Sequence, residues 1–339
     1  MTFFPRPLPS PKELHKRLPL TAHQQHTLAE NQKEAIAILQ GHEPRLVIFA
    51  GPCSIHSPAL ALKYAAKIKQ LAAKVSDRIF LVMRVFLEKP RTQFGWKGFL
   101  YDPFLDGSNA IHEGIHRSRA LLLDIITLGV PMATEFLDPF LSPYHSDLIT
   151  WGIIGARTSA SQIHRQMASH LSIPIGFKND TNGQVDNAIF GALAAHHPQT
   201  LIGVNPEGQV CSLHSRGNPH THLILRGSVR TSNYDPLSIA QAIHQQRLLG
   251  LYSRLIIDCA HGNSNKKDDK QSEVFHAVLN QWQQGNNVIA GLMLESHLEG
   301  KHRLSLTDPC LDWETTAELI FSAYNDLKPL FPKKSPQIS

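Results

Sequence analysis

Residues 45–58 have the sequence Arg-Leu-Val-Ile-Phe-Ala-Gly-Pro-Cys-Ser-Ile-His-Ser-Pro. Residues 45–50 form a short, mostly apolar run, which predicts a strand that is buried on both faces. Ser57 can cap a helix and Pro58 suits a first helical position, so a helix is expected over 58–75. A buried strand followed by a helix is the repeating unit of a parallel α/β fold.

The same unit recurs along the chain. Seven further apolar runs predict strands at 79–86, 131–136, 152–156, 174–178, 222–226, 254–259 and 288–294. Helices are expected near 111–128, 143–150, 159–170, 184–196, 237–249, 270–284 and 312–327. Eight such units predict a closed (β/α)8 TIM barrel. The alternative is a doubly wound open sheet, but Ala50-Gly51-Pro52-Cys53 lacks the glycine-rich turn of dinucleotide-binding sheets.

Three segments lie outside this repeat. Residues 1–43 are expected to form an N-terminal arm, extended at its proline-rich start and helical over 22–40. Residues 201–216 carry an extra apolar run, which predicts a hairpin inserted before the sixth strand. The barrel domain is therefore assigned to residues 44–328, and residues 329–339 are expected to be a flexible tail.

The composition is typical of a globular protein: 339 residues, of which 42% are apolar and 18% charged. No apolar run is as long as a membrane span, and the start lacks a secretion signal, so no membrane partner is expected. Four scattered cysteines favour a reducing compartment, the cytoplasm. The net charge of +5 comes without a basic helix face or a basic run interleaved with aromatics, which argues against nucleic-acid binding.

Reactive and charged side chains gather where the predicted strands end, which is where the chemistry of such barrels takes place. They are Cys53, Arg84, Lys89, Arg91, Thr92, Glu135, Arg157, Lys178, Arg226, His261, Glu295 and Asp308. Each alone has an ordinary explanation, such as a buried cysteine, an ion-paired arginine or a hydrogen-bonded histidine. Charges at buried strand ends are costly unless they are paired or ligated, so the set as a whole indicates a functional site.

The set divides into metal ligands and cations. Cys53, His261, Glu295 and Asp308 offer one sulfur, one imidazole and two carboxylates, which suits one divalent ion such as Mn, Fe, Zn or Co. The six cations are Arg84, Lys89, Arg91, Arg157, Lys178 and Arg226. They would repel one another at one barrel mouth unless anions bind there. They predict substrates that carry more than one phosphate between them, together with a carboxylate.

These residues stand in motifs by which the chain resembles the type I 3-deoxy-D-arabino-heptulosonate 7-phosphate (DAHP) synthases. The motifs include Gly-Pro-Cys-Ser-Ile-His (51–56), Glu-Lys-Pro-Arg-Thr (88–92), Gly-Trp-Lys-Gly (95–98), Trp-Gly-Ile-Ile-Gly-Ala-Arg-Thr (151–158) and Glu-Ser-His-Leu (295–298), and the resemblance spans residues 51–308. It implies a transferase that condenses phosphoenolpyruvate with D-erythrose 4-phosphate and water. The products would be DAHP and phosphate, in the first step of the shikimate pathway to aromatic amino acids.

The resemblance also implies roles for single residues. Phosphoenolpyruvate would be held by Arg84, Lys89, Arg157, Lys178 and Arg226, and the phosphate of erythrose 4-phosphate by Arg91 and Thr92. The metal, held by Cys53, His261, Glu295 and Asp308, would polarise the aldehyde. Lys89 would transfer protons, with a pKa that neighbouring cations are expected to lower. Glu135 is expected to orient water or a cation.

Regulation and assembly are expected from the same resemblance. An aromatic amino acid effector would act through the arm and the 201–216 hairpin, where Gly203 favours tyrosine, and the chain would form a homo-oligomer. The stretch between Glu295 and Asp308 is shorter than in bacterial members, so Asp308 must reach the metal through a tighter loop. Two alternatives are a related enzyme that uses arabinose 5-phosphate and an inactive barrel that binds an aromatic amino acid or a partner enzyme.

Overall fold

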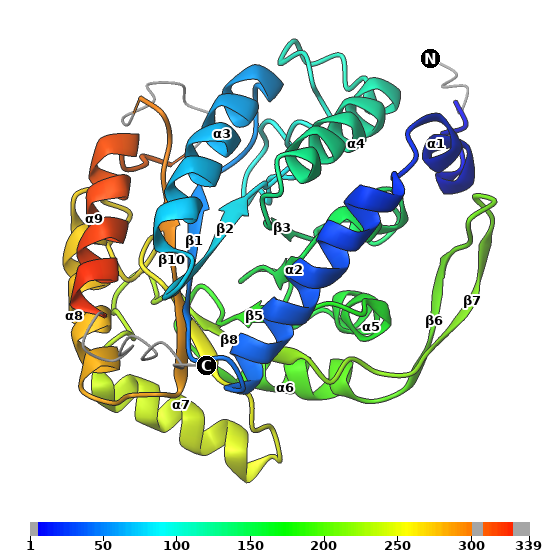
Figure 1. The fold of residues 1–339 in the computed structure, drawn as a ribbon. Coiled ribbons are helices and arrows are strands. Elements are labelled where there is room, and N and C mark those ends of the chain that lie inside the picture. The colour runs from blue at the N-terminus through cyan, green and yellow to red at the C-terminus, as the bar shows by residue number, and fades with distance from the viewer. Residues whose placement is uncertain (1–5, 300–307, 328–339) are drawn as a thin grey trace, which may run out of the picture.

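Eight parallel strands close into one barrel in the computed structural model, which describes residues 6–299 and 308–327 (Figure 1). In chain order they are β1 (Leu46–Gly51), β2 (Ile79–Arg84), β3 (Met132–Glu135), β4 (Trp151–Ile154), β5 (Ile175–Lys178), β8 (Thr221–Leu225), β9 (Leu255–Asp258) and β10 (Ile289–Glu295). Around the barrel the order is β1-β10-β9-β8-β5-β4-β3-β2. The predicted TIM barrel is confirmed, and the open sheet is excluded.

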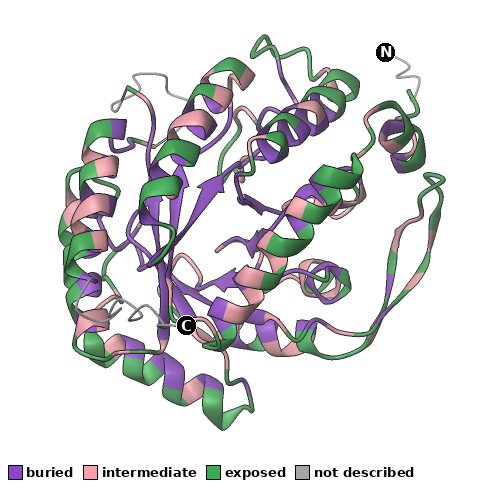
Figure 2. Cartoon of the chain, viewed as in Figure 1, coloured by how far each residue is buried: buried purple, intermediate pink, exposed green. Residues whose placement is uncertain are grey.

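The strands form a barrel because both of their faces are apolar. Every residue of the eight barrel strands is buried. Val47 and Phe49 point into the barrel with residues such as Trp151, while Leu46 and Ile48 pack outward against the helices. Figure 2 shows the result as a buried centre and helices whose outer faces are exposed.

The helices between the strands are mostly where the sequence predicts them. They are α3 (Pro58–Val75), α4 (Ile111–Thr127), α5 (Gln162–His170), α6 (Asp186–His196), α7 (Pro236–Leu248), α8 (Lys270–Gln283) and α9 (Trp313–Asp326). The helix predicted over 143–150 is wrong, because two short 3-10 helices, η1 (Ser142–Tyr144) and η2 (Ser146–Leu148), occupy that connection. Side chains anchor it instead: Asp147 binds Arg119 at 2.8 Å, and the Tyr144 hydroxyl donates to the Pro9 carbonyl at 2.7 Å.

The N-terminal arm contains one helix more than expected. Helix α1 (Pro11–Arg17) precedes α2 (Ala22–Gln40), because Ser10 and Glu13 form a capping box and proline is favourable at a first helical position. The extended start therefore applies to residues 6–10 alone, and residues 1–5 lie outside the described part. Helix α2 lies across the barrel, where its Ala35, Ile38 and Leu39 join the apolar cluster of the barrel interior (Figure 1).

The predicted hairpin is confirmed as the antiparallel pair β6 (Gln199–Val204) and β7 (Val210–Ser215). It projects from the barrel beside α1, and two bonds of Lys12 hold its tip: the amide donates to the Pro206 carbonyl at 2.9 Å, and Nζ lies 3.0 Å from Glu207 (Figure 1). Among the described residues no helix combines the length and apolar character needed to cross a membrane. The predicted tail, 329–339, lies outside the described residues.

Candidate active site

A cavity of about 280 Å³ opens at the carboxyl ends of the barrel strands. Its walls contain all but one of the twelve residues predicted from the sequence: Cys53, Lys89, Arg91, Thr92, Glu135, Arg157, Lys178, Arg226, His261, Glu295 and Asp308. The exception is Arg84, which is 0% exposed beneath the floor of the cavity. The closure of the barrel thus brings together side chains that are separated by up to 255 positions along the sequence (308 − 53).

Three of the four predicted metal ligands form one cluster. The ligand atoms of Cys53, Glu295 and Asp308 all lie within 4.8 Å of one another. Strand pairing places Gly51 beside Glu295, and the Leu311 amide donates to the Glu295 carbonyl at 3.0 Å, which brings the short Asp308 segment to the end of β10. Asp308 therefore reaches the site. One thiol and two carboxylates suit a divalent transition metal.

The Cys53 thiol is shaped by burial and by acidic neighbours. Burial raises its pKa to about 11, and Glu295 and Asp308 add to the effect. A cation between these groups would favour the thiolate and relieve the repulsion between the carboxylates. The cluster of Cys53, Glu295 and Asp308 would therefore be more stable with a metal ion bound between its members than without one.

His261 stands at the edge of this cluster. Its Nε2 lies 3.6 Å from Glu295 Oε1, and its Nδ1 lies 3.0 Å from Asp258 Oδ2, but it is not within reach of all three cluster members. Its backbone is left-handed, with φ of 55°, a conformation that residues other than glycine seldom adopt. A carboxylate behind an imidazole is the usual arrangement for orienting a histidine toward a metal.

Asp258, at the end of β9, was missed from the sequence. It is fully buried, and its Oδ2 accepts a hydrogen bond from Lys178 Nζ at 2.7 Å in addition to its contact with His261. Burial opposes its ionisation, but His261 and Lys178 together hold its pKa well below the usual range. Its place at a strand end, three residues before His261, was the signal that could have identified it.

The buried cations support the acids of the site as well as lining it. Arg84 donates from Nη2 to Glu295 Oε1 at 2.9 Å and lies 4.0 Å above the Phe86 ring. Arg157 donates from Nε to Thr92 Oγ1 at 2.8 Å, on the side of the cavity that also carries Arg91. Arg84 and Lys178 are therefore already paired with carboxylates, whereas Arg157 is bonded to a neutral hydroxyl.

The predicted pKa shift of Lys89 is wrong in direction. Its Nζ donates to Cys53 Sγ at 2.8 Å. Burial alone would lower the pKa of Lys89, but the charges of Cys53 and Glu295 outweigh it, so the pKa is raised. The neighbours of this ammonium group are acids and a thiol rather than the cations assumed from the sequence.

Two further carboxyl groups line the cavity, Glu135 and Glu88. Glu135, at the end of β3, is 6% exposed, and its Oε1 makes no hydrogen bond to the described residues. A Cβ at position 155 would collide with this atom, so Gly155 provides the space for it. Glu88 is 1% exposed, and burial, aided by Asp138 and Glu135, raises its pKa to about 8. Glu88 begins the Glu-Lys-Pro-Arg-Thr motif, and the sequence predicted no role for it.

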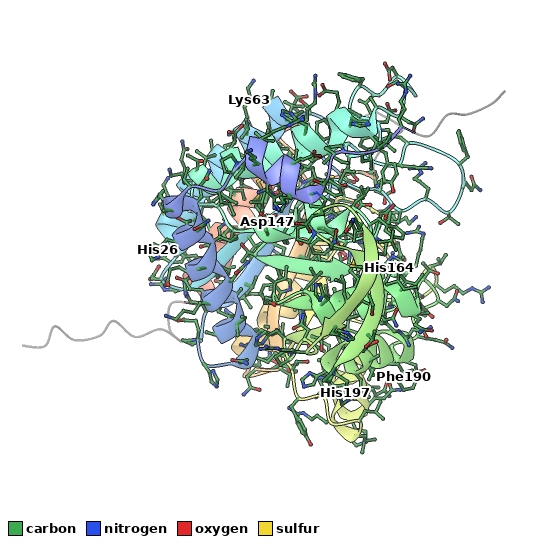
Figure 3. The ribbon with its side chains drawn as sticks, turned by 90° about the vertical axis from the view of Figure 1, so that its right-hand side faces the viewer. His26, Lys63, Asp147, His164, Phe190 and His197 are labelled. Atoms are coloured by element: carbon green, nitrogen blue, oxygen red, sulfur yellow. The ribbon has the colours of Figure 1, made fainter. Side chains whose placement is uncertain are left out.

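A second cavity of about 270 Å³ lies between α1, the 3-10 helices, α5 and the hairpin. Its wall is mostly apolar, and its polar side chains include His15 and His170. Gly203 of β6 is part of the wall, opposite Leu213. Figure 3 shows the face of the molecule that bears the hairpin, with Asp147 and His164 labelled beside this region.

Comparisons with known proteins agree with this architecture. The model of the DAHP synthetase I family matches residues 20–324. The Tyr-sensitive phospho-2-dehydro-3-deoxyheptonate aldolase of Escherichia coli is 44% identical, over 94% of this chain and 93% of its own length. The tyrosine-inhibited enzyme of Schizosaccharomyces pombe is 40% identical, over 91% of this chain and 87% of its own length. A solved structure of the aldolase from Francisella tularensis superimposes with a TM-score of 0.92 at 37% identity, covering 96% of this chain and 98% of that one. The chain belongs to the DAHP synthetase I family.

Proposed function

We propose that the cavity at the carboxyl ends of the strands is where this chain carries out the reaction of its family. That reaction joins phosphoenolpyruvate to D-erythrose 4-phosphate with addition of water, gives DAHP and phosphate, and opens the shikimate pathway to aromatic amino acids. The observation that carries the proposal is the convergence of a Cys53, Glu295 and Asp308 cluster with a group of cations in one cavity. A thiol-containing ligand set beside phosphate-binding cations suits this metal-dependent transferase chemistry.

The metal would be held by Cys53, Glu295 and Asp308, with His261 as the fourth ligand. Enzymes of this family depend on a metal ion in general. The donor set favours Mn, Fe, Zn or Co over Mg or Ca. When bound, such an ion supplies Lewis acidity to the aldehyde oxygen of erythrose 4-phosphate.

The cations of the wall would hold the substrates. Arg157, Lys178 and Arg226 are proposed to bind the phosphate and carboxylate of phosphoenolpyruvate, with Arg84 acting from below through Glu295. Arg91 and Thr92, at the mouth, are proposed to bind the phosphate of erythrose 4-phosphate. Bidentate guanidinium contacts would fix both substrates so that C3 of phosphoenolpyruvate faces the aldehyde carbon.

Proton transfer is assigned to Lys89 and Glu135. Because its pKa is raised, Lys89 is protonated at neutral pH, and its ammonium group is proposed to hydrogen-bond the aldehyde oxygen and to give it a proton as the negative charge develops there during the attack of C3 on the aldehyde carbon. Glu135 presents a buried oxygen to the cavity and is proposed to orient the water that adds at C2. The bond between C2 and the phosphate oxygen then breaks and C2 becomes a ketone; of the two protons of the added water, one returns to Lys89 and the other leaves with the phosphate.

The first experiment is to measure consumption of phosphoenolpyruvate with erythrose 4-phosphate, in chelator and then with Mn added back. Loss in chelator and recovery with Mn is expected. Consumption with arabinose 5-phosphate in place of erythrose 4-phosphate would instead indicate the related aldol enzyme. No consumption with either aldehyde, together with binding of an aromatic amino acid, would indicate an inactive binding barrel.

The second cavity is the proposed site of an aromatic effector. The E. coli and S. pombe relatives are named Tyr-sensitive and tyrosine-inhibited, and the cavity lies between the arm and the hairpin as expected. Tyrosine is favoured because both of these relatives are named for it, and a Cβ at position 203 would press on Leu213 in the wall of this cavity. Tyrosine should inhibit wild type more strongly than phenylalanine, and Gly203→Ser should weaken that inhibition. Equal inhibition by both amino acids would contradict the preference.

The hairpin also supports a homo-oligomer. Ile202 and Val210 are 72% and 68% exposed on β6 and β7. A second copy of the chain that covers these two side chains is the proposed arrangement, to be tested by light scattering on wild type and Ile202→Asp.

None of the four cysteines is bonded to another in the described residues, and the cytoplasm remains the compartment proposed for the chain.

A further inference from the structure

The side chain of Glu88 links the backbone that follows β2 to the backbone that follows β3 through hydrogen bonds. It follows β2 by four residues, and its carboxylate is 1% exposed. One oxygen accepts the Leu137 amide at 3.2 Å and the other accepts the Asp138 amide at 3.0 Å. These amides belong to the backbone that leaves β3 after Glu135. A buried carboxyl group whose two oxygens each accept a main-chain amide fixes that backbone firmly.

The same backbone has further anchors. The Tyr101 hydroxyl donates to Asp138 Oδ2 at 2.6 Å, and His164 Nε2 lies 2.6 Å from the Leu137 carbonyl. Two residues before Leu137, the Oε1 atom of Glu135 is buried in the cavity wall with no hydrogen-bond partner among the described residues. A buried oxygen without a partner is unfavourable, so the surrounding structure must hold it in place.

We propose that Glu88 is a positioning residue for the reaction, which acts by fixing the Leu137–Asp138 backbone so that Glu135 is presented to the cavity. The inference rests on the role proposed for Glu135. Glu88 also lines the cavity, so its carboxylate has a second route of action, direct contact with a substrate. The two routes differ in what they do to kcat and KM, and in whether the effects of Glu88 and Glu135 are independent.

The test is a double-mutant cycle with Glu88→Gln, Glu135→Gln and the double variant. Glutamine keeps the size of Glu88 but presents an amide group to one of the two amide donors, so one bond is lost. Each single variant is expected to lower kcat at least about tenfold while KM for both substrates stays within about twofold. The double variant is expected to be no slower than Glu135→Gln alone.

Three results would overturn the proposal: a wild-type rate for Glu88→Gln, an equal loss on the wild-type and Glu135→Gln backgrounds, or a rise in KM for one substrate. If Glu135→Gln alone retains the wild-type rate, both the role of Glu135 and the positioning role fail. The family reaction, measured on wild type, stands independently of these variants.

Glu88→Asp, which keeps both acceptor oxygens on a shorter side chain, repeats the cycle if the glutamine variant does not fold. Glu314→Gln, an exposed carboxylate on α9, should leave kcat unchanged.

Discussion

At the residue scale, Asp258 connects the metal cluster to the cations. It touches His261 at 3.0 Å and Lys178 at 2.7 Å from a fully buried position. Asp258→Asn keeps the shape but removes the charge that orients the imidazole. We expect the metal affinity to fall about 10–100-fold, because removal of a carboxylate behind a ligating histidine has that effect.

The affinity can be measured by competition with a coloured chelator. Asp269→Asn provides a control, because that carboxylate is exposed at the start of α8 and contacts neither His261 nor Lys178 in the described structure. An unchanged affinity for Asp258→Asn would show that His261 is not held toward the metal by this residue.

Most of the residues that line the cavity could be predicted from the sequence, but the contacts between them could not. Parallel strands end at the same side of a barrel, so polar residues after apolar runs, such as Cys53 and Glu295, were expected to meet. The direction of the Lys89 pKa shift depends on which charges lie nearest in space, which the order of residues along the chain does not determine. The contacts of Glu88 could not be predicted for the same reason, since its partners are main-chain amides that follow another strand.

At the scale of single elements, two buried histidines should make the fold sensitive to acid. Burial lowers the pKa of His145, between η1 and η2, to about 4 and that of His222, in β8, to about 3. Both are neutral in the folded chain, but they gain protons in the unfolded chain once the pH falls below 6.5. The free energy of unfolding should therefore fall as the pH drops below 6.5, by about 2 kcal/mol per histidine at pH 5.

Urea unfolding at pH 7 and pH 5 checks this expectation with His222→Gln. Glutamine can accept the bond that Trp151 Nε1 donates to His222 at 3.2 Å, but it does not titrate. Its loss of stability between the two pH values should be smaller than that of wild type by about 2 kcal/mol. His26→Gln, on the exposed side of α2, should lose as much as wild type. An identical loss for His222→Gln would contradict the assignment.

Helix α1 should affect inhibition through the second cavity but not the reaction in the first. Ser10→Ala removes the cap that binds the Glu13 amide, which costs about 1 kcal/mol of helix stability. Because Pro11 and His15 line the second cavity, inhibition by tyrosine should weaken while kcat without tyrosine stays the same. Hydrogen exchange in α1 should increase. Thr21→Ala removes an equivalent cap from α2 and should leave inhibition unchanged.

The elements were predictable where local chemistry agrees with the fold. Ser57 caps α3 as its sequence indicated, and the buried strands follow from their apolar runs. The 143–150 connection begins with Ser142-Pro143, a pair that can start a helix, but most of the residues after it are weak helix formers. The contacts of Tyr144 and Asp147 with distant residues hold it as 3-10 turns instead.

At the scale of the whole molecule, the arm is part of the barrel rather than an attachment to it. Ala35 and Ile38 of α2 are 0% exposed and Leu39 is 2% exposed, all within the interior cluster. Arg254, before β9, donates to the Ile38 carbonyl at 2.8 Å. The sequence boundary at residue 43 separates a helix from the first strand, but the core is continuous across it.

This continuity predicts different outcomes for two deletions. Removal of residues 1–40 uncovers the barrel interior, and burial of each large apolar side chain contributes about 1.5–3 kcal/mol, so the remaining chain should be too unstable to purify as a folded protein.

Removal of residues 1–19 takes away α1 but leaves α2 in place. That protein should unfold cooperatively, consume phosphoenolpyruvate at a rate near that of the full chain, and lose inhibition by tyrosine, because Pro11 and His15 are missing from the second cavity. Circular dichroism during heating and the substrate assay with and without tyrosine measure these properties. A stable, active chain without residues 1–40 would mean that α2 does not close the barrel, and inhibition that persists without residues 1–19 would mean that the effector binds elsewhere.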